Sequence, residues 1–247
     1  MLITMKEMLD VAQKNKFAVP AFNAGTGQLL TAMMESAEEK QAPVIMAIHP
    51  DELSFLRDSF ISSVIYEANH SKVPMVLHLD HGATYEQCIH AIQLGFTSVM
   101  IDASNETLDE NIRITKEVVD YAHAHGVVVE GELGQLAGIE DDVNLENHSY
   151  TKPEEVEEFV CRTGVDSLAI AIGTSHGAFK FKPGIKPQLR FDILDEVSER
   201  LPEFPIVLHG ASSVSTKYVD IINSNGGKLK DAIGVPEDML RQAAKSA

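Results

Sequence analysis

Short apolar runs alternate with longer amphipathic stretches along this chain, and this alternation restricts the fold more than any other feature. The runs are rich in Val, Ile and Leu and lack a polar alternation, which is typical of strands buried on both faces of a parallel sheet. The stretches between them repeat apolar residues three and four positions apart, which predicts helices. We expect strands within residues 17–22, 44–48, 75–79, 98–101, 127–130, 167–172 and 206–208.

Three of the intervening stretches have well-defined helical patterns, over residues 31–40, 108–125 and 153–162. The last opens with Pro153 and acidic residues, as helix N-termini often do. Regular alternation of strand and helix implies a parallel sheet with right-handed crossovers. Periodicity alone is compatible with either a doubly wound open sheet or a closed barrel.

Polar residues at the ends of the expected strands favour the barrel. An open sheet would spread seven strand ends over roughly 25–30 Å, at about 4.8 Å per strand, whereas a barrel gathers them at one rim. Only a barrel would place His81, His176 and His209 around one point. We therefore expect residues 1–247 to form a single (β/α)8 TIM barrel domain. The polar residues are Asn23, His49, Asp80, His81, Asp102, Glu132, His176 and His209.

The charge balance restricts the possible partners. The formal net charge is −17, with 37 acidic against 20 basic residues, which argues against binding nucleic acid or an anionic membrane. Cys88 and Cys161 fall in expected helices and do not indicate a disulfide framework. We find no signal peptide and no stretch of 18 apolar residues, so we expect a cytoplasmic protein without a membrane anchor.

Three of the polar strand ends are His-Gly pairs, at His81, His176 and His209. A catalytic zinc takes three protein ligands and keeps one open position, so three imidazoles at one rim would suit it. A single His at a strand end is more often a satisfied polar residue, and the chain has ten His. The repetition of the pair at three separate strands favours a metal site.

Acidic residues accompany the His-Gly pairs. Asp80 precedes His81 and is either a general base toward a substrate hydroxyl or a carboxylate that orients an imidazole. Glu132 and Asp102 follow strands of their own and are either metal ligands or members of an ion-pair network at the rim. The residues alone leave these alternatives open.

Two Gly- and Ser-rich turns, at residues 173–180 and 210–213, follow the last two expected strands. Their N–H groups, hydroxyls and Lys180 would form a phosphate cradle. The connection at 138–152 is long and acidic for a βα loop, and it is a candidate for a mobile lid.

Together these segments resemble the class II fructose-bisphosphate and tagatose-bisphosphate aldolases. The resemblance covers nearly the whole chain in order, and the combination of motifs is specific although each motif alone is not. The matching stretches are PAFN at 20–23, LHLDHG at 77–82, VEGELG at 129–134, AIGTSHG at 171–177, KPQLRF at 186–191 and LHGAS at 208–212.

The resemblance implies a zinc enzyme of glycolysis that reversibly cleaves fructose 1,6-bisphosphate to dihydroxyacetone phosphate and glyceraldehyde 3-phosphate. It implies that His81, His176 and His209 hold the Zn²⁺, and that Glu132 and Asp102 lie near the metal and serve when zinc shifts to an outer site. A monovalent cation and a homodimer or larger homo-oligomer are further expectations from the family.

The resemblance also assigns the substrate contacts. Asp80 would handle the proton of the C4 hydroxyl, and Glu140, on the long loop, would exchange a proton with the enediolate carbon. Asn23 would contact the dihydroxyacetone-phosphate part. The phosphate would be held by Gly177, Lys180, Gly210 and Ser212.

The chain departs from the family at two places that matter. His49 stands where the family usually has Ser or Thr, and the family continues beyond Ala247 into an eighth strand, which is missing from the sequence as given. We therefore expect the barrel to be incomplete at its C-terminus.

Other functions remain open. The first alternative is an aldolase for tagatose 1,6-bisphosphate or another ketose phosphate. The others are a zinc hydrolase and a non-catalytic partner subunit on the same fold. A lysine Schiff-base mechanism is disfavoured because none of the seven expected strands contains a Lys.

Overall fold

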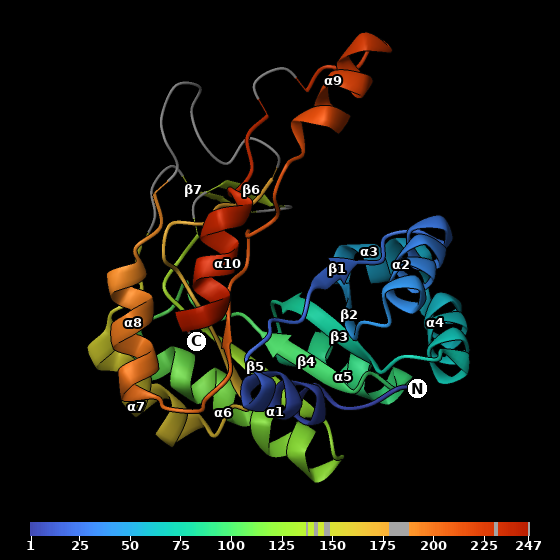
Figure 1. The fold of residues 1–247 in the computed structure, drawn as a ribbon. Coiled ribbons are helices and arrows are strands. Elements are labelled where there is room, and N and C mark those ends of the chain that lie inside the picture. Colours follow the sequence, from blue (N-terminus) through green and yellow to red (C-terminus); the bar gives the residue numbers. More distant parts are fainter. Residues whose placement is uncertain (137, 141–142, 146–148, 178–187, 230–231, 247) are drawn as a thin grey trace. The chain divides into compact units, whose positions relative to one another are not determined.

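The computed structural model describes residues 1–247 except 137, 141–142, 146–148, 178–187, 230–231 and 247 (Figure 1). Its internal contacts divide the chain into two units, which are described separately. The first unit is Met1–Glu132 with Glu158–Leu168, and the second is Leu133–Glu157 with Ala169–Ala247.

Seven strands form one sheet in the order of the sequence, β1-β2-β3-β4-β5-β8-β9. The pairs from β1–β2 to β4–β5 are parallel. A doubly wound sheet reverses its strand order at a switch point, and this order has no reversal, so the predicted (β/α) barrel class is confirmed. No strand follows β9 in the described part of the chain. The strands are β1 (Ala21–Asn23), β2 (Val44–Ile48), β3 (Met75–Gly82), β4 (Ser98–Ile101), β5 (Val128–Leu133), β8 (Ser167–Ile170) and β9 (Ile206–Val207).

The predicted strands overlap the observed ones but differ from them in their bounds. The first was predicted within residues 17–22, whereas β1 covers only Ala21–Asn23. One strand was predicted within residues 127–130, yet β5 runs on to Leu133 with Glu130 and Glu132 both buried. The segment predicted as a long loop contains a short antiparallel pair, β6 (Gly138–Glu140) and β7 (Val143–Leu145).

Threonine caps determine where several helices of the first unit begin. The side chains of Thr26, Thr84 and Thr107 each accept a backbone N–H from the first turn of the helix that follows. The cap at Thr26 starts α2 four residues before its predicted start.

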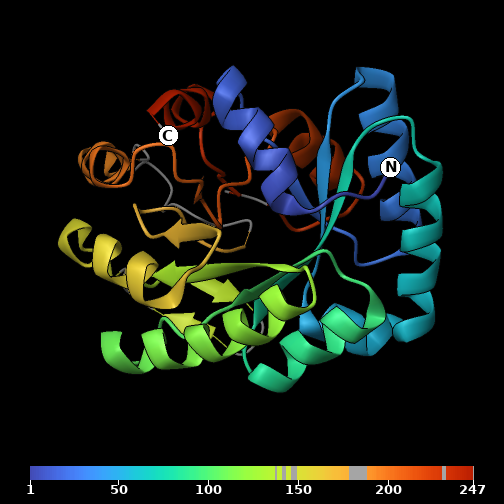
Figure 2. The ribbon, with the colours of Figure 1, turned by 90° about the horizontal axis from the view of Figure 1, so that it is seen from below.

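Among these helices, α5 and α6 pack side by side (Figure 2). The helices are α1 (Met5–Asn15), α2 (Gly27–Lys40), α3 (Pro50–Leu56), α4 (Asp58–His70), α5 (Tyr85–Leu94), α6 (Leu108–Ala124) and α7 (Pro153–Thr163), the last of which contributes to both units.

α1 covers the amino ends of the central strands. Met5 and Met8 of α1 are buried against Ile45 of β2 and Val76 of β3, and Ile3 pairs through its backbone N–H with the carbonyl of Met75. Because parallel strands all point the same way, the carboxyl ends of β1–β5 lie away from α1 and are available to form a site.

The second unit contains α8 (Phe191–Arg200), α9 (Thr216–Ser224) and α10 (Glu237–Ser246). α8 and α10 lie side by side (Figure 1). Across the described residues of both units, none of the helices combines the length and the apolar character needed to span a bilayer.

The two cysteines are free thiols in contrasting surroundings. Cys88 on α5 is buried and donates to the Met100 carbonyl at 3.5 Å, and burial raises the pKa of its thiol to about 12. Cys161 on α7 is exposed.

We expect a thiol reagent at pH 8 to modify Cys161 in the native protein and Cys88 only after unfolding, because the thiolate is the reactive form. Mass spectrometry of wild type and Cys161→Ser would check this, and rapid native labelling of Cys88 would contradict it.

Candidate functional site

The end of β3 is irregular, and this irregularity turns two neighbouring side chains toward one cluster. Successive side chains of a regular strand point to opposite faces. Here the pairing with β4 shifts register between Leu79 and Gly82, and His81 has a left-handed φ of 48°, which is uncommon for a residue other than Gly. His81 Nε2 consequently lies 3.9 Å from Asp80 Oδ1.

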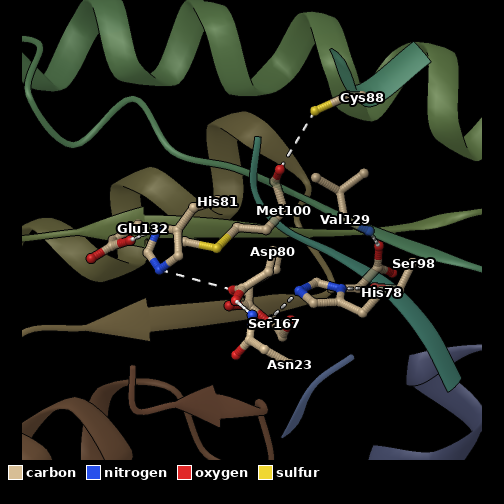
Figure 3. A network of polar contacts seen from close by, with 12 residues as sticks. Asn23, His78, Asp80, His81, Cys88, Ser98, Met100, Val129, Glu132 and Ser167 are labelled. Carbon is tan, nitrogen blue, oxygen red and sulfur yellow. Dashed lines mark hydrogen bonds and ion pairs between the residues drawn. The ribbon is translucent and has the colours of Figure 1, made fainter. Parts of the chain in front are cut away.

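Three neighbouring strands contribute to the acidic cluster around His81. His81 Nδ1 lies 3.6 Å from Oε2 of Glu132 on β5, which Figure 3 shows beside it. The same nitrogen lies 3.1 Å from Oδ2 of Asp102, which follows β4. Asp80 and Glu132 are buried, and His81 and Asp102 are partly buried. The structure therefore brings together four of the predicted site residues.

The two acids that flank His81 differ in their electrostatics. Burial raises the pKa of Glu132 well above its usual range, and the charge of Asp102 adds to the rise. Burial also acts to raise the pKa of Asp102, but the hydrogen bond and charge of His81, with further hydrogen bonds from Ser104, lower it to about 2. Negative charge thus concentrates on Asp102.

This donor set fits a metal ion. Imidazole nitrogen and carboxylate oxygen are both zinc ligands, and potential ligand atoms of His81, Asp102 and Glu132 lie within 4.8 Å of one another. Glu132 Oε2 is buried and accepts no hydrogen bond from the described residues. A cation would offset the cost of burying an acceptor that lacks a donor.

Asn23 at the end of β1 joins this cluster through Asp80. Its Nδ2 donates to Asp80 Oδ2 at 2.8 Å (Figure 3). Asp80 is only 6% exposed, and this amide is one of its polar partners.

A second polar layer, made of residues that were not predicted to belong to the site, lies beside this cluster (Figure 3). His78 Nδ1 lies 2.9 Å from Ser98 Oγ, and its Nε2 lies 3.9 Å from Oε2 of Glu130. Ser167 Oγ donates to the same Glu130 oxygen at 3.4 Å. The two-residue spacing from His78 to Asp80 and from Glu130 to Glu132 was the available signal.

The second unit holds the remaining described site residues on two turns. His176 and Gly177 follow β8, and His209, Gly210 and Ser212 follow β9. Gly210 has a φ of 59°, and a Cβ at this position would lie 2.7 Å from the Ser175 carbonyl carbon. The two glycine-rich turns are therefore packed backbone to backbone.

The structure does not describe the side chains of two predicted site residues, Glu140 and Lys180. Glu140 ends β6, with its backbone paired to Val143, but its side chain is not described. Lys180 lies outside the described residues. His81 belongs to the first unit and His176 and His209 to the second, so the three-histidine ligand set stays a prediction.

Comparisons with known proteins agree with the predicted family. The sequence profile described as fructose-bisphosphate aldolase class-II matches residues 3–243. The fructose-bisphosphate aldolase of Treponema pallidum is 46% identical, over 100% of this chain and 80% of that protein, and that of Giardia intestinalis is 45% identical, over 98% and 75%.

Solved structures give the same result. The YdjI aldolase of Escherichia coli K12 aligns with a TM-score of 0.74 and 29% identity, over 100% of this chain and 92% of that chain. The fructose-bisphosphate aldolase of Campylobacter jejuni aligns with a TM-score of 0.71 and 26% identity, over 100% and 75%. The profile match and the identity to the two relatives together show that the chain belongs to the class II fructose-bisphosphate aldolase family.

Proposed function

We propose that this protein is a zinc-dependent aldolase that reversibly cleaves fructose 1,6-bisphosphate to dihydroxyacetone phosphate and glyceraldehyde 3-phosphate. The observation that supports it best is the cluster of Asp80, His81, Asp102 and Glu132 at the carboxyl ends of β3, β4 and β5, in a chain of the class II family. We also propose that the protein is cytoplasmic and assembles as a homodimer or a larger homo-oligomer.

The metal would be held by His81, His176 and His209, with Asp102 and Glu132 as further ligands. Zinc, when bound, would polarise the ketose carbonyl and stabilise the negative charge that develops on its oxygen. The orphaned Glu132 oxygen and the mixed nitrogen and oxygen donor set support a cation at this place.

The protein's own residues would move the protons. Asp80 accepts the proton of the C4 hydroxyl as the C3–C4 bond breaks, and the electron pair stays with the dihydroxyacetone-phosphate half. Glu140 then donates a proton to the C3 carbon. The amide of Asn23 holds Asp80 at 2.8 Å and faces the same half of the substrate.

The phosphate of that half would be held by the turns after β8 and β9, through Gly177, Lys180, Gly210 and Ser212. Left-handed φ values at Gly177 (79°) and Gly210 (59°) support this, because such turns present backbone N–H groups to anions. The same arrangement would serve tagatose 1,6-bisphosphate or another ketose phosphate. The observation that favours testing these substrates is His49, which directly follows β2 and stands where the family usually has Ser or Thr.

The proposal is tested by cleavage of fructose 1,6-bisphosphate by the purified protein, before chelation, after it, and with zinc restored. We expect chelation to abolish cleavage and zinc to restore it. His176→Ala should lose both zinc and activity, whereas His90→Ala, at an exposed His paired with Asp58, should lose neither. Bound zinc without cleavage would shift the proposal to another ketose phosphate, and neither zinc nor cleavage with any ketose bisphosphate would contradict it.

A further inference from the structure

The carboxylate of Glu52 is held by hydrogen bonds beside the candidate site, although no sequence motif predicted a role for it. It lies on α3, directly after β2, and is partly buried. His49 caps this helix, with its Nδ1 accepting the N–H of Asp51 at 3.2 Å, and Glu52 Oε2 accepts the N–H of His49 at 3.1 Å. This capping box holds the Glu52 carboxylate back toward the strand ends.

The other carboxylate oxygen of Glu52 rests against the segment that follows β1. A Cβ at Gly25 would lie only 2.5 Å from Glu52 Oε1, so the absence of a side chain at Gly25 makes room for the carboxylate. Asn23 is two residues away along the same segment. Glu52 therefore links α3 to the end of β1.

The electrostatics of Glu52 connect it to both Asn23 and Asp80. Burial raises the pKa of Glu52, and the charge of Asp80 adds to that rise. The backbone N–H of His49 and the side-chain amide of Asn23 act in the opposite direction. Asn23 Nδ2 also donates to Asp80 Oδ2 at 2.8 Å, so its amide interacts with two carboxylates.

Two carboxylates determine which way an Asn amide points. An ionised carboxylate only accepts hydrogen bonds, whereas the Asn amide has an NH₂ with two donors and an oxygen that accepts. The NH₂ of Asn23 must therefore face Glu52 and Asp80, and its oxygen must turn away from them. With only one acidic neighbour the two ends of the amide, which are nearly equal in size, would be easier to exchange.

We propose that Glu52 is a positioning residue for the aldol cleavage: it fixes the orientation of the Asn23 amide, and through Asn23 it holds the Asp80 carboxylate in place to accept the substrate proton. This inference rests on the proposed function of Asp80. It also accounts for three neighbouring features together, namely the His49 cap, Gly25 and the Asn23–Asp80 hydrogen bond.

Glu52→Gln tests the proposal, because it preserves shape but supplies a donor that allows the Asn23 amide to turn over. For the zinc-loaded enzyme we expect kcat to fall about 10- to 100-fold, the range for losing a hydrogen bond to a charged group. The matched control is Asp51→Asn, which removes the same charge from the adjacent, exposed residue and should stay within about twofold of wild type.

A double-mutant cycle separates positioning from general structural damage. If Glu52 acts through Asn23, Glu52→Gln should cost less than about twofold when added to Asn23→Ala, because neighbouring effects of this kind are not additive. Full additivity of the two losses in kcat would overturn the proposal.

A third measurement does not depend on catalysis. The side-chain amide signals of Asn23, identified by their loss in Asn23→Ala, should shift and exchange faster with water in Glu52→Gln but not in Asp51→Asn. An unchanged Asn23 amide in Glu52→Gln would overturn the positioning role. Failure of the wild-type protein to cleave any ketose bisphosphate would instead overturn the proposed function while leaving this result interpretable.

Discussion

Replacing Asp80 by Asn is expected to reduce kcat for fructose 1,6-bisphosphate cleavage by about 10²- to 10⁴-fold, the usual contribution of a positioned general base. The substitution keeps the size of the side chain and an oxygen that can accept the 2.8 Å hydrogen bond from Asn23. It removes the basicity of the group and its negative charge.

Zinc content distinguishes this outcome from loss of the metal site. His81, Asp102 and Glu132 are unchanged in Asp80→Asn, so we expect zinc to remain bound while turnover is lost. Asp58→Asn is the control, because Asp58 is exposed and paired with His90, and it should retain full activity. Wild-type kcat in Asp80→Asn would exclude Asp80 as the base, and loss of zinc would make it a metal-supporting residue.

The sequence was sufficient to predict the strand order and most of the strand ends that carry chemistry. Buried parallel strands have a strong apolar signal, and polar residues that interrupt it stand out, as Asp80, His81 and Asp102 do. Glu132 was also identified, although the strand that carries it was predicted too short. A charged residue usually indicates the surface, and nothing local shows that Glu130 and Glu132 are buried among partners from other strands.

The contacts that shape the site were not predictable, because each depends on a residue distant in the sequence. The register shift at the end of β3 exists only relative to β4, so no local pattern announces that Asp80 and His81 turn to the same side. The place of Glu52 likewise depends on Gly25 and Asn23 of the preceding strand–helix connection. Hydrophobic periodicity predicts where helices and strands lie in the sequence, but contacts such as these depend on how the helices and strands pack against one another.

The irregular end of β3 leads to the second large expected effect, at Gly82. A Cβ there would lie 2.6 Å from the Met100 carbonyl oxygen and 2.9 Å from Cys88 Sγ, which is buried. The Met100 carbonyl is backbone and cannot move without displacing β4, and the Cys88 side chain is fully buried. We therefore expect Gly82→Ala to lower the free energy of unfolding by about 1–3 kcal/mol, as other overpacking substitutions do.

Gly82→Ala should reduce activity as well, because the added methyl pushes β3 away from β4 beside the 3.1 Å contact of His81 with Asp102. A displacement of about 1 Å between catalytic groups can cost roughly 100-fold in rate.

Gly27→Ala is the matched control, and it should keep both stability and activity. A Cβ at this exposed start of α2 would meet no neighbouring atom within 4 Å, and alanine favours a helix by up to about 1 kcal/mol over glycine. Chemical denaturation gives the free energy of unfolding of each variant, and both this value and kcat/KM are compared with those of wild type. If Gly82→Ala unfolded at the same denaturant concentration as wild type and kept its activity, β3 and β4 would have room between them, and the tight junction that orients His81 would not be needed for the site.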